Sequence, residues 1–150
     1  MAGTWALARA AFAAALNGQT ATPTDHKLAT LVCSEYPIGS NQTSAPYAYV
    51  IPPELETIRF PGGWRALTGE IKIRVILAGT TDIVSLTKQR DAWALVVTDA
   101  FDEKITLDGA CDYIGEQSVT MLAKYDEDQA WGFETVFENF RVSNAETFAS

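Results

Sequence analysis

Residues Thr68 to Ala78 read TGEIKIRVILA, and this stretch decides the fold class of the chain. Its apolar side chains fall on alternate positions, which are Ile71, Ile73, Val75 and Leu77. The charged residues Glu70, Lys72 and Arg74 point the other way, so the pattern predicts a strand with one buried face and one solvated face. A common strand has ~5–6 residues, and this one is about twice as long. We therefore expect a sheet that extends beyond the body of its own subunit.

Helical patterns lie on both sides of this strand. Thr4 to Leu16 is rich in alanine, with Thr4 as a suitable N-cap and Asn17-Gly18 as a stop signal. Roughly Asp82 to Lys104 forms a longer amphipathic pattern that predicts a central helix with a wide core-facing stripe. The stripe comprises Ile83, Leu86, Arg90, Trp93, Leu95, Val96, Val97, Ala100 and Phe101.

Other segments complete a sheet around the long strand. The predicted strands are Leu28 to Cys33, Tyr47 to Ile51, Glu54 to Phe60, Ser118 to Tyr125 and Ala130 to Val142. The last two should form a closing β-hairpin across the acidic turn Asp126-Glu127-Asp128. This order predicts a single α+β domain over residues 1–150, with a mixed or antiparallel sheet packed by two helices. We expect residues 1–3 and 143–150 to be flexible or ordered by a partner.

Composition and charge narrow the function. The 150 residues are 47% apolar and 20% charged, and the net charge is -8. An acidic chain is poorly suited to phosphate contacts, so we do not expect direct nucleic-acid binding. Arg59, Arg65, Lys72 and Arg74 lie close in sequence, either as a local basic patch or, as we favour, on a solvated strand face. No run approaches the ~20 apolar residues that a membrane helix needs, and Arg9 interrupts the apolar N-terminal stretch, which lacks the pattern of a signal peptide.

Residues suited to catalysis or metal binding are scarce. The one histidine, His26, lies in a polar loop without metal-ligand spacing. Cys33 and Cys111 are far apart in sequence, and we expect reduced, buried thiols rather than a disulfide or a zinc site. The sequence therefore predicts no catalytic residue, no metal and no cofactor.

Contacts with a partner are expected at exposed, irregular segments, where binding residues tend to lie. These segments are the Pro52-Pro53 bend, the Pro61 to Ala66 loop, the acidic turn at 126–128 and the tail after Ser143. Trp64 follows a Pro-Gly-Gly turn and could anchor a partner or pack under its own loop. The candidate contact residues are Pro52, Pro53, Gly62, Gly63, Trp64, Arg65, Asp126, Glu127, Asp128 and Phe148.

Five stretches carry a resemblance to a known family. They are Trp5 to Leu16, Pro46 to Pro53 (PYAYVIPP), Thr68 to Ala78, Ile83 to Phe101 and Ala130 to Val142. Together they comprise 63 of the 150 residues, spread from residue 5 to residue 142. They give an N-terminal helix, a bent strand region, a long amphipathic helix and a closing hairpin. In this layout the chain resembles the tail terminator (tail completion) proteins of long-tailed bacteriophages, which are small α+β proteins. The loop from Glu35 to Ala45 and the segment around Trp64 have no counterpart in that pattern.

The resemblance implies a structural virion protein, and it carries over no catalytic residue. It implies a homo-oligomeric ring, typically a hexamer, on the head-proximal end of the tail tube. There the ring stops tube polymerisation and joins the tail to a neck or head-completion protein. Such a protein is made in the host cytoplasm and ends in the tail or neck of the virion. Six copies at -8 each carry -48, so we expect DNA to pass through the ring without specific binding.

Three alternatives remain at this point. Another head-tail connector or neck completion protein would share the size, the acidity and the ring assembly. A small-molecule-binding α+β domain would have a pocket between the central helix and the sheet. An enzyme would need a cleft that collects acidic side chains from several strands.

Overall fold

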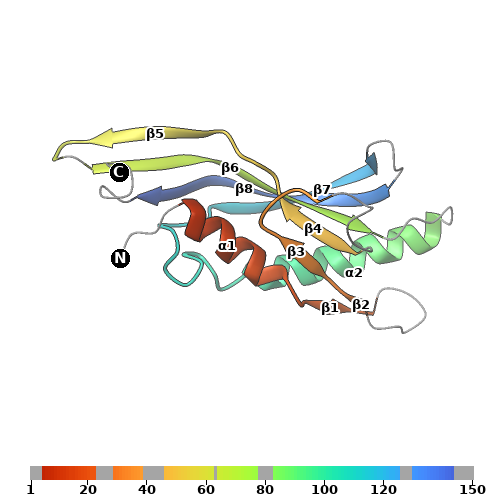
Figure 1. Ribbon diagram of the computed structural model, residues 1–150. Helices are drawn as coiled ribbons and strands as arrows, with labels where there is room; N and C mark the ends of the chain where they lie inside the picture. The colour runs from red at the N-terminus through yellow and green to blue at the C-terminus, as the bar shows by residue number, and fades with distance from the viewer. Residues whose placement is uncertain are drawn as a thin grey trace.

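The computed structural model describes residues 5–22, 29–38, 46–62, 64–77, 83–125 and 130–143. Helices α1 (Trp5–Leu16) and α2 (Ile83–Phe101) lie on one face of a mixed sheet, and neither helix covers the other face (Figure 1). The chain is therefore α+β, as its sequence predicts. The strands are β1 (Thr20–Ala21), β2 (Ala29–Thr30), β3 (Val32–Ser34), β4 (Tyr47–Val50), β5 (Leu55–Phe60), β6 (Trp64–Leu77), β7 (Glu116–Tyr125) and β8 (Ala130–Ser143).

Strand β6 is the central strand of the sheet and pairs with three other strands. Along one edge it pairs with β8 over most of its length, from Ala66↔Ser143 to Leu77↔Trp131. Its other edge is shared by two strands: β4 pairs with residues 73–76, and β5 pairs with residues 64–69. The chain passes from β4 to β5 through residues 51–54, where Pro52 and Pro53 cannot donate to a ladder and so end the pairing. β7 completes the sheet beside β8, and β3 pairs in parallel with β4.

The core lies between the sheet and the two helices. Ile71, Ile73, Val75 and Leu77 are all buried, which confirms the alternation read from the sequence. The Phe12 ring of α1 packs against three other phenylalanine rings, with centroid distances of 5.9 Å to Phe101, 5.2 Å to Phe137 and 5.7 Å to Phe140. These rings come from both helices and β8, so they join the two layers of the domain.

A bulge in β8 changes which residues face the core. Phe133 and Phe137 are buried on the helix side, and beyond the bulge Phe140 and Val142 are buried there as well. Asn139 has a φ of 61°, and the register with β6 shifts between Gly69 and Ile71. The extra residue lets both halves of the strand direct apolar side chains inward. Gly115, with a φ of 81°, lies against the bulge, and a Cβ there would overlap the carbonyl oxygen of Glu138.

Several predicted boundaries were wrong. β6 begins at Trp64, not Thr68, because pairing with β5 extends it to the turn at residues 61–62. Thus residues 64–66, predicted as part of an exposed loop, are strand, and Ala66 is fully buried. Ser143, predicted to open a flexible tail, ends β8, and its hydroxyl donates a hydrogen bond to Asp112 Oδ2 at 2.6 Å. Residues 1–3 and 144–150 lie outside the described residues.

Two further predictions need correction. The segment from Leu28 to Cys33 is not one strand: β2 pairs with β1 in a separate two-stranded sheet, and β3 pairs with β4. Leu31 separates them, because its backbone bonds to Gly18 and Gln19 at the end of α1. Helix α2 ends at Phe101, and its buried stripe is narrower than expected, since Leu95 is 63% exposed.

We predict that Gly115→Ala destabilises the fold far more than Gly109→Ala. Both glycines have positive φ, which costs a residue with a Cβ about 1–2 kcal/mol. A Cβ at Gly109 would meet no atom within 4 Å, whereas one at Gly115 would overlap the Glu138 backbone. We therefore expect a loss of about 1–2 kcal/mol for Gly109→Ala and an additional 1–3 kcal/mol or so for Gly115→Ala. Urea unfolding measures both; equal losses would show that the backbone at the bulge relaxes freely.

Candidate functional site

Strand β5 and the first residues of β6 form a hairpin, here called the arm (residues 55–67). It extends past both helices at one end of the sheet (Figure 1). Residues 56–59 are exposed, including 38% of Ile58. The outer edge of β5 pairs with no other described strand. The base of the arm is anchored, because Ala66 and Leu67 pair with β8, and Leu55 and Leu67 pack against the core. The free outer edge of β5 can accept a further strand or another surface.

The arm carries two arginines directly opposite each other. Arg59 of β5 and Arg65 of β6 are register partners, so their side chains emerge on the same face. Like charges in this position destabilise a strand pair. Neither guanidinium forms an ion pair with another residue of the described ranges. The arm thus carries two adjacent positive charges with no ion-pair partner among the described residues.

Phe60 holds the arm to the rest of the sheet. Its ring lies 4.7 Å from the guanidinium of Arg141 in β8, a cation–π distance. Arg141 in turn forms an ion pair with Asp112, with Nε 3.4 Å from Oδ2. Asp112 also accepts the hydrogen bond of Ser143. These contacts fix the base of the arm to β8 and to the segment before β7, and they leave residues 56–59 exposed.

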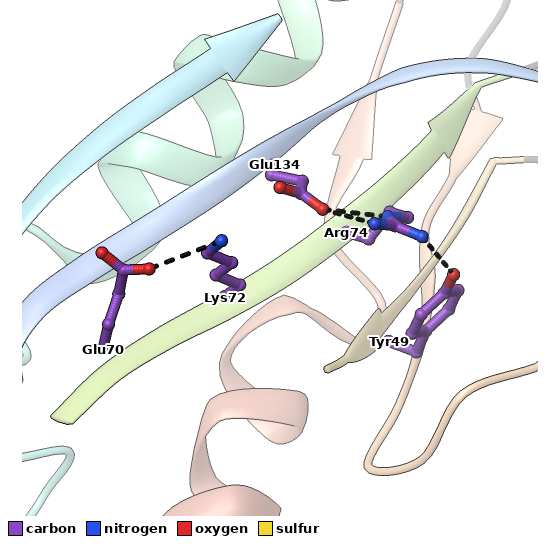
Figure 2. Close-up of polar contacts among 5 residues, drawn as sticks. All are labelled: Tyr49, Glu70, Lys72, Arg74 and Glu134. Atoms are coloured by element: carbon purple, nitrogen blue, oxygen red, sulfur yellow. Dashed lines mark hydrogen bonds and ion pairs between the residues drawn. The ribbon is translucent and has the colours of Figure 1, made fainter. Parts of the chain in front are cut away.

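The uncovered face of the sheet carries an ordered set of charges (Figure 2). Arg74 donates from Nε and Nη2 to Glu134 Oε2 at 3.0 and 2.7 Å, and from Nη1 to the Tyr49 hydroxyl at 3.4 Å. Burial lowers the pKa of Arg74, but these hydrogen bonds outweigh burial and hold the pKa above its ordinary value. Lys72 and Glu70 form a looser pair at 3.5 Å. The charges of these residues are therefore matched, and their hydrogen bonds hold the Arg74 side chain in one place.

Two adjoining hollows lie where the chain crosses from β4 to β5. One, of about 600 Å³, is lined by Glu54, Leu55, Glu56, Thr68, Gly69, Glu70, Glu138 and Asn139. The other, of about 370 Å³, is lined by residues 51–54, Glu70 and Lys72. Four glutamates line the two hollows: Glu54, Glu56, Glu70 and Glu138. Small-molecule sites are usually more apolar, with only a few placed polar groups. Among the described residues, no group of three or more His, Cys, Asp or Glu side chains is arranged to hold a metal ion.

The interface between α2 and the sheet is packed with side chains. Trp93, Val97 and Phe101 of α2 are at most 3% exposed and belong to the same core cluster as the sheet residues. Both cysteines are in this cluster as free thiols, as expected. Burial raises the pKa of Cys33 to about 12, and burial with the nearby Asp112 carboxylate raises the pKa of Cys111 to about 12. Neither thiol is suited to act as a nucleophile.

The structure brings some of the predicted contact residues together. Gly62, with a φ of 90°, lies in the turn at the tip of the arm, and Trp64 and Arg65 follow in β6. Pro52 is exposed and Pro53 half-buried, and both line the smaller hollow near the base of the arm. The other candidates lie outside the described residues: Gly63, Asp126, Glu127, Asp128 and Phe148. His26 lies outside them too.

Arg59 was not among the predicted contact residues. Its signal was available, because strand alternation on both sides of the turn at residues 61–63 places residues 59 and 65 opposite each other. The prediction treated Trp64 and Arg65 as loop and so lost this register.

Comparison with known proteins adds no family to this description. No protein-family model matches the sequence, and no curated protein matches it. Within the described part of the chain, no helix is long and apolar enough to cross a membrane. The proposals below therefore depend on the residues and geometry of this chain.

We predict a measurable coupling between Arg74 and Glu134. In a double-mutant cycle of Arg74→Met and Glu134→Gln, the double variant should be about 1–2 kcal/mol more stable than additivity predicts, because each single change leaves a half-buried charge without its partner. Lys72→Met with Glu70→Gln is the matched control, since both side chains are about half exposed at 45% and 48%. Its coupling should stay below about 0.5 kcal/mol. Equal coupling in the two cycles, measured by urea unfolding, would contradict this account of the sheet face.

Proposed function

We propose that this protein is the tail terminator of a long-tailed bacteriophage, a ring-forming subunit that caps the head-proximal end of the tail tube. The arm carries the proposal. Its outer strand is exposed at residues 56–59, which alternate between the two faces of the ribbon, and has an unpaired edge among the described strands. In a protein that acts alone, such an element would be a liability; in an assembling subunit it is a contact surface.

The order of elements supports the same proposal. The chain has an N-terminal helix, a bent strand region at Pro52-Pro53, a long central helix and a closing hairpin of β7 and β8. This is the layout on which the resemblance to tail terminators depends. A ring requires two different surfaces on each subunit that meet head to tail. The arm at one end of a two-layer body can supply one of them.

The charge of the molecule suits a channel that carries DNA. The chain has a net charge of -8, and the hollows on the uncovered face are lined by Glu54, Glu56, Glu70 and Glu138. An acidic lumen would repel phosphates and let the duplex slide without binding. The lysine and arginine side chains of the sheet face are matched by carboxylates, as for Arg74 with Glu134.

The mass of the purified protein, measured by light scattering with and without isolated tail tubes, tests this function. We expect a hexamer of six 16.3 kDa chains, about 98 kDa, either in free solution or once tubes are added, and rings at one end of the tubes in electron micrographs. The assembly should show no tight, salt-sensitive binding to duplex DNA.

Other results would redirect the proposal. A ring that binds isolated portals or neck proteins but not tube ends would favour another head-tail connector. A monomer that ignores tail tubes and binds a metabolite would contradict the terminator function and favour a small-molecule-binding domain.

A further inference from the structure

A ring subunit needs a second surface that contacts the arm of the neighbouring copy. Charged groups without an ion-pair partner in the subunit are candidates for both sides of this contact. The arm offers Arg59 and Arg65, opposed across the hairpin and without an ion pair in the described ranges. A partner for them should present at least two carboxylates, exposed and placed in a concave surface that can receive a ribbon.

The C-terminal end of α2 presents such a surface. Asp99, Asp102 and Glu103 are exposed around a hollow of about 470 Å³, which Ala100, Lys104 and Asp108 also line. Lys104 is paired with Asp108 at 3.1 Å, which leaves the other three carboxylates without a cation among the described residues. The last turn of α2 contains no basic residue. Carboxylates at a helix C-terminus oppose the helix dipole, so this cluster is unfavourable in an isolated subunit.

We propose that the arm of one copy docks through Arg59 and Arg65 into the acidic hollow at the end of α2 of the next copy. This inference rests on the ring assembly proposed above and names the contact that would build it. No ion pair joins the two clusters within the described part of the chain, so each remains available to a second molecule. Because the two surfaces differ, the contact is heterologous and can close into a ring.

A second copy of this chain is a better occupant of the arm than nucleic acid. The chain has a net charge of -8, which would repel a phosphate backbone. The protein supplies the complementary surface itself, with three unmatched carboxylates facing two unmatched guanidinium groups.

Charge exchange tests the contact. Arg59→Glu with Arg65→Glu (the arm variant) and Asp102→Lys with Glu103→Lys (the helix-end variant) should each remain folded by circular dichroism and be monomeric by light scattering. The chain that carries all four substitutions should regain the ring, because the charges are exchanged on both sides. Arg65→Glu alone should weaken association about tenfold or more. Lys88→Glu changes the charge by the same amount as Arg65→Glu, at an exposed position of α2. It is the matched control for Arg65→Glu and should leave association unchanged.

The outcomes separate this inference from the proposed function. If the wild-type protein forms rings and the arm variant forms them equally well, the inference is overturned and the terminator function stands. If the wild type stays monomeric even with tail tubes, the function itself fails. A third outcome also overturns the inference. In it the arm variant keeps the ring, and its melting temperature falls by as much as that of a wild-type chain from which residues 144–150 are deleted. The arm would then bind the C-terminal segment of its own chain.

Discussion

The structure depends on one strand, β6, which pairs with two different strands, β4 and β5, along the same edge. β6 has 14 residues, and β4 and β5 share the edge that faces away from β8. Where β4 pairs, both helices pack against one face of the sheet, and Ile73 and Val75 of β6 are buried on that face. Where β5 pairs, the ribbon runs beyond the helices. One part of β6 therefore belongs to the core and another part belongs to the arm. Pro52 and Pro53, between β4 and β5, mark the boundary between these two parts.

The bulge in β8 makes this arrangement compatible with one apolar core. Without an extra residue near Asn139, the alternation that buries Phe133 and Phe137 would turn Phe140 and Val142 toward the uncovered face. Phe140 contacts both Phe12 and Trp5 of α1, at 5.7 Å in each case. The bulge thus secures α1 to the part of the sheet from which the arm leaves. Gly115 is required beside it because only a residue without a Cβ fits against the Glu138 backbone.

The sequence predicted the parts of the fold that local patterns determine. The alternation in Ile71, Ile73 and Val75 and the repeat of Trp93, Val97 and Phe101 are strong because burial on one face imposes a fixed period. The start of β6 at Trp64 and the small sheet of β1 and β2 could not be found in this way. They depend on pairing between segments whose own residues show little pattern. The Arg59–Arg65 pair was not predicted for the same reason, because it depends on the pairing register of the hairpin and not on a local pattern. Charges that are matched or unmatched in space, such as those at the end of α2, require the structure.

The account joins these features into one claim: the arm is a contact surface that is completed by another molecule of the same chain. Hydrogen–deuterium exchange of the wild-type protein, followed at low and high protein concentration, tests the claim most directly. The claim predicts that the amides of residues 55–60 exchange quickly in the dilute protein. These amides and those of residues 99–103 should become protected as the protein associates. The amides of residues 71–77 should be protected throughout. Association that protects other segments and leaves residues 55–60 exchanging as fast as in the dilute protein would contradict the claim.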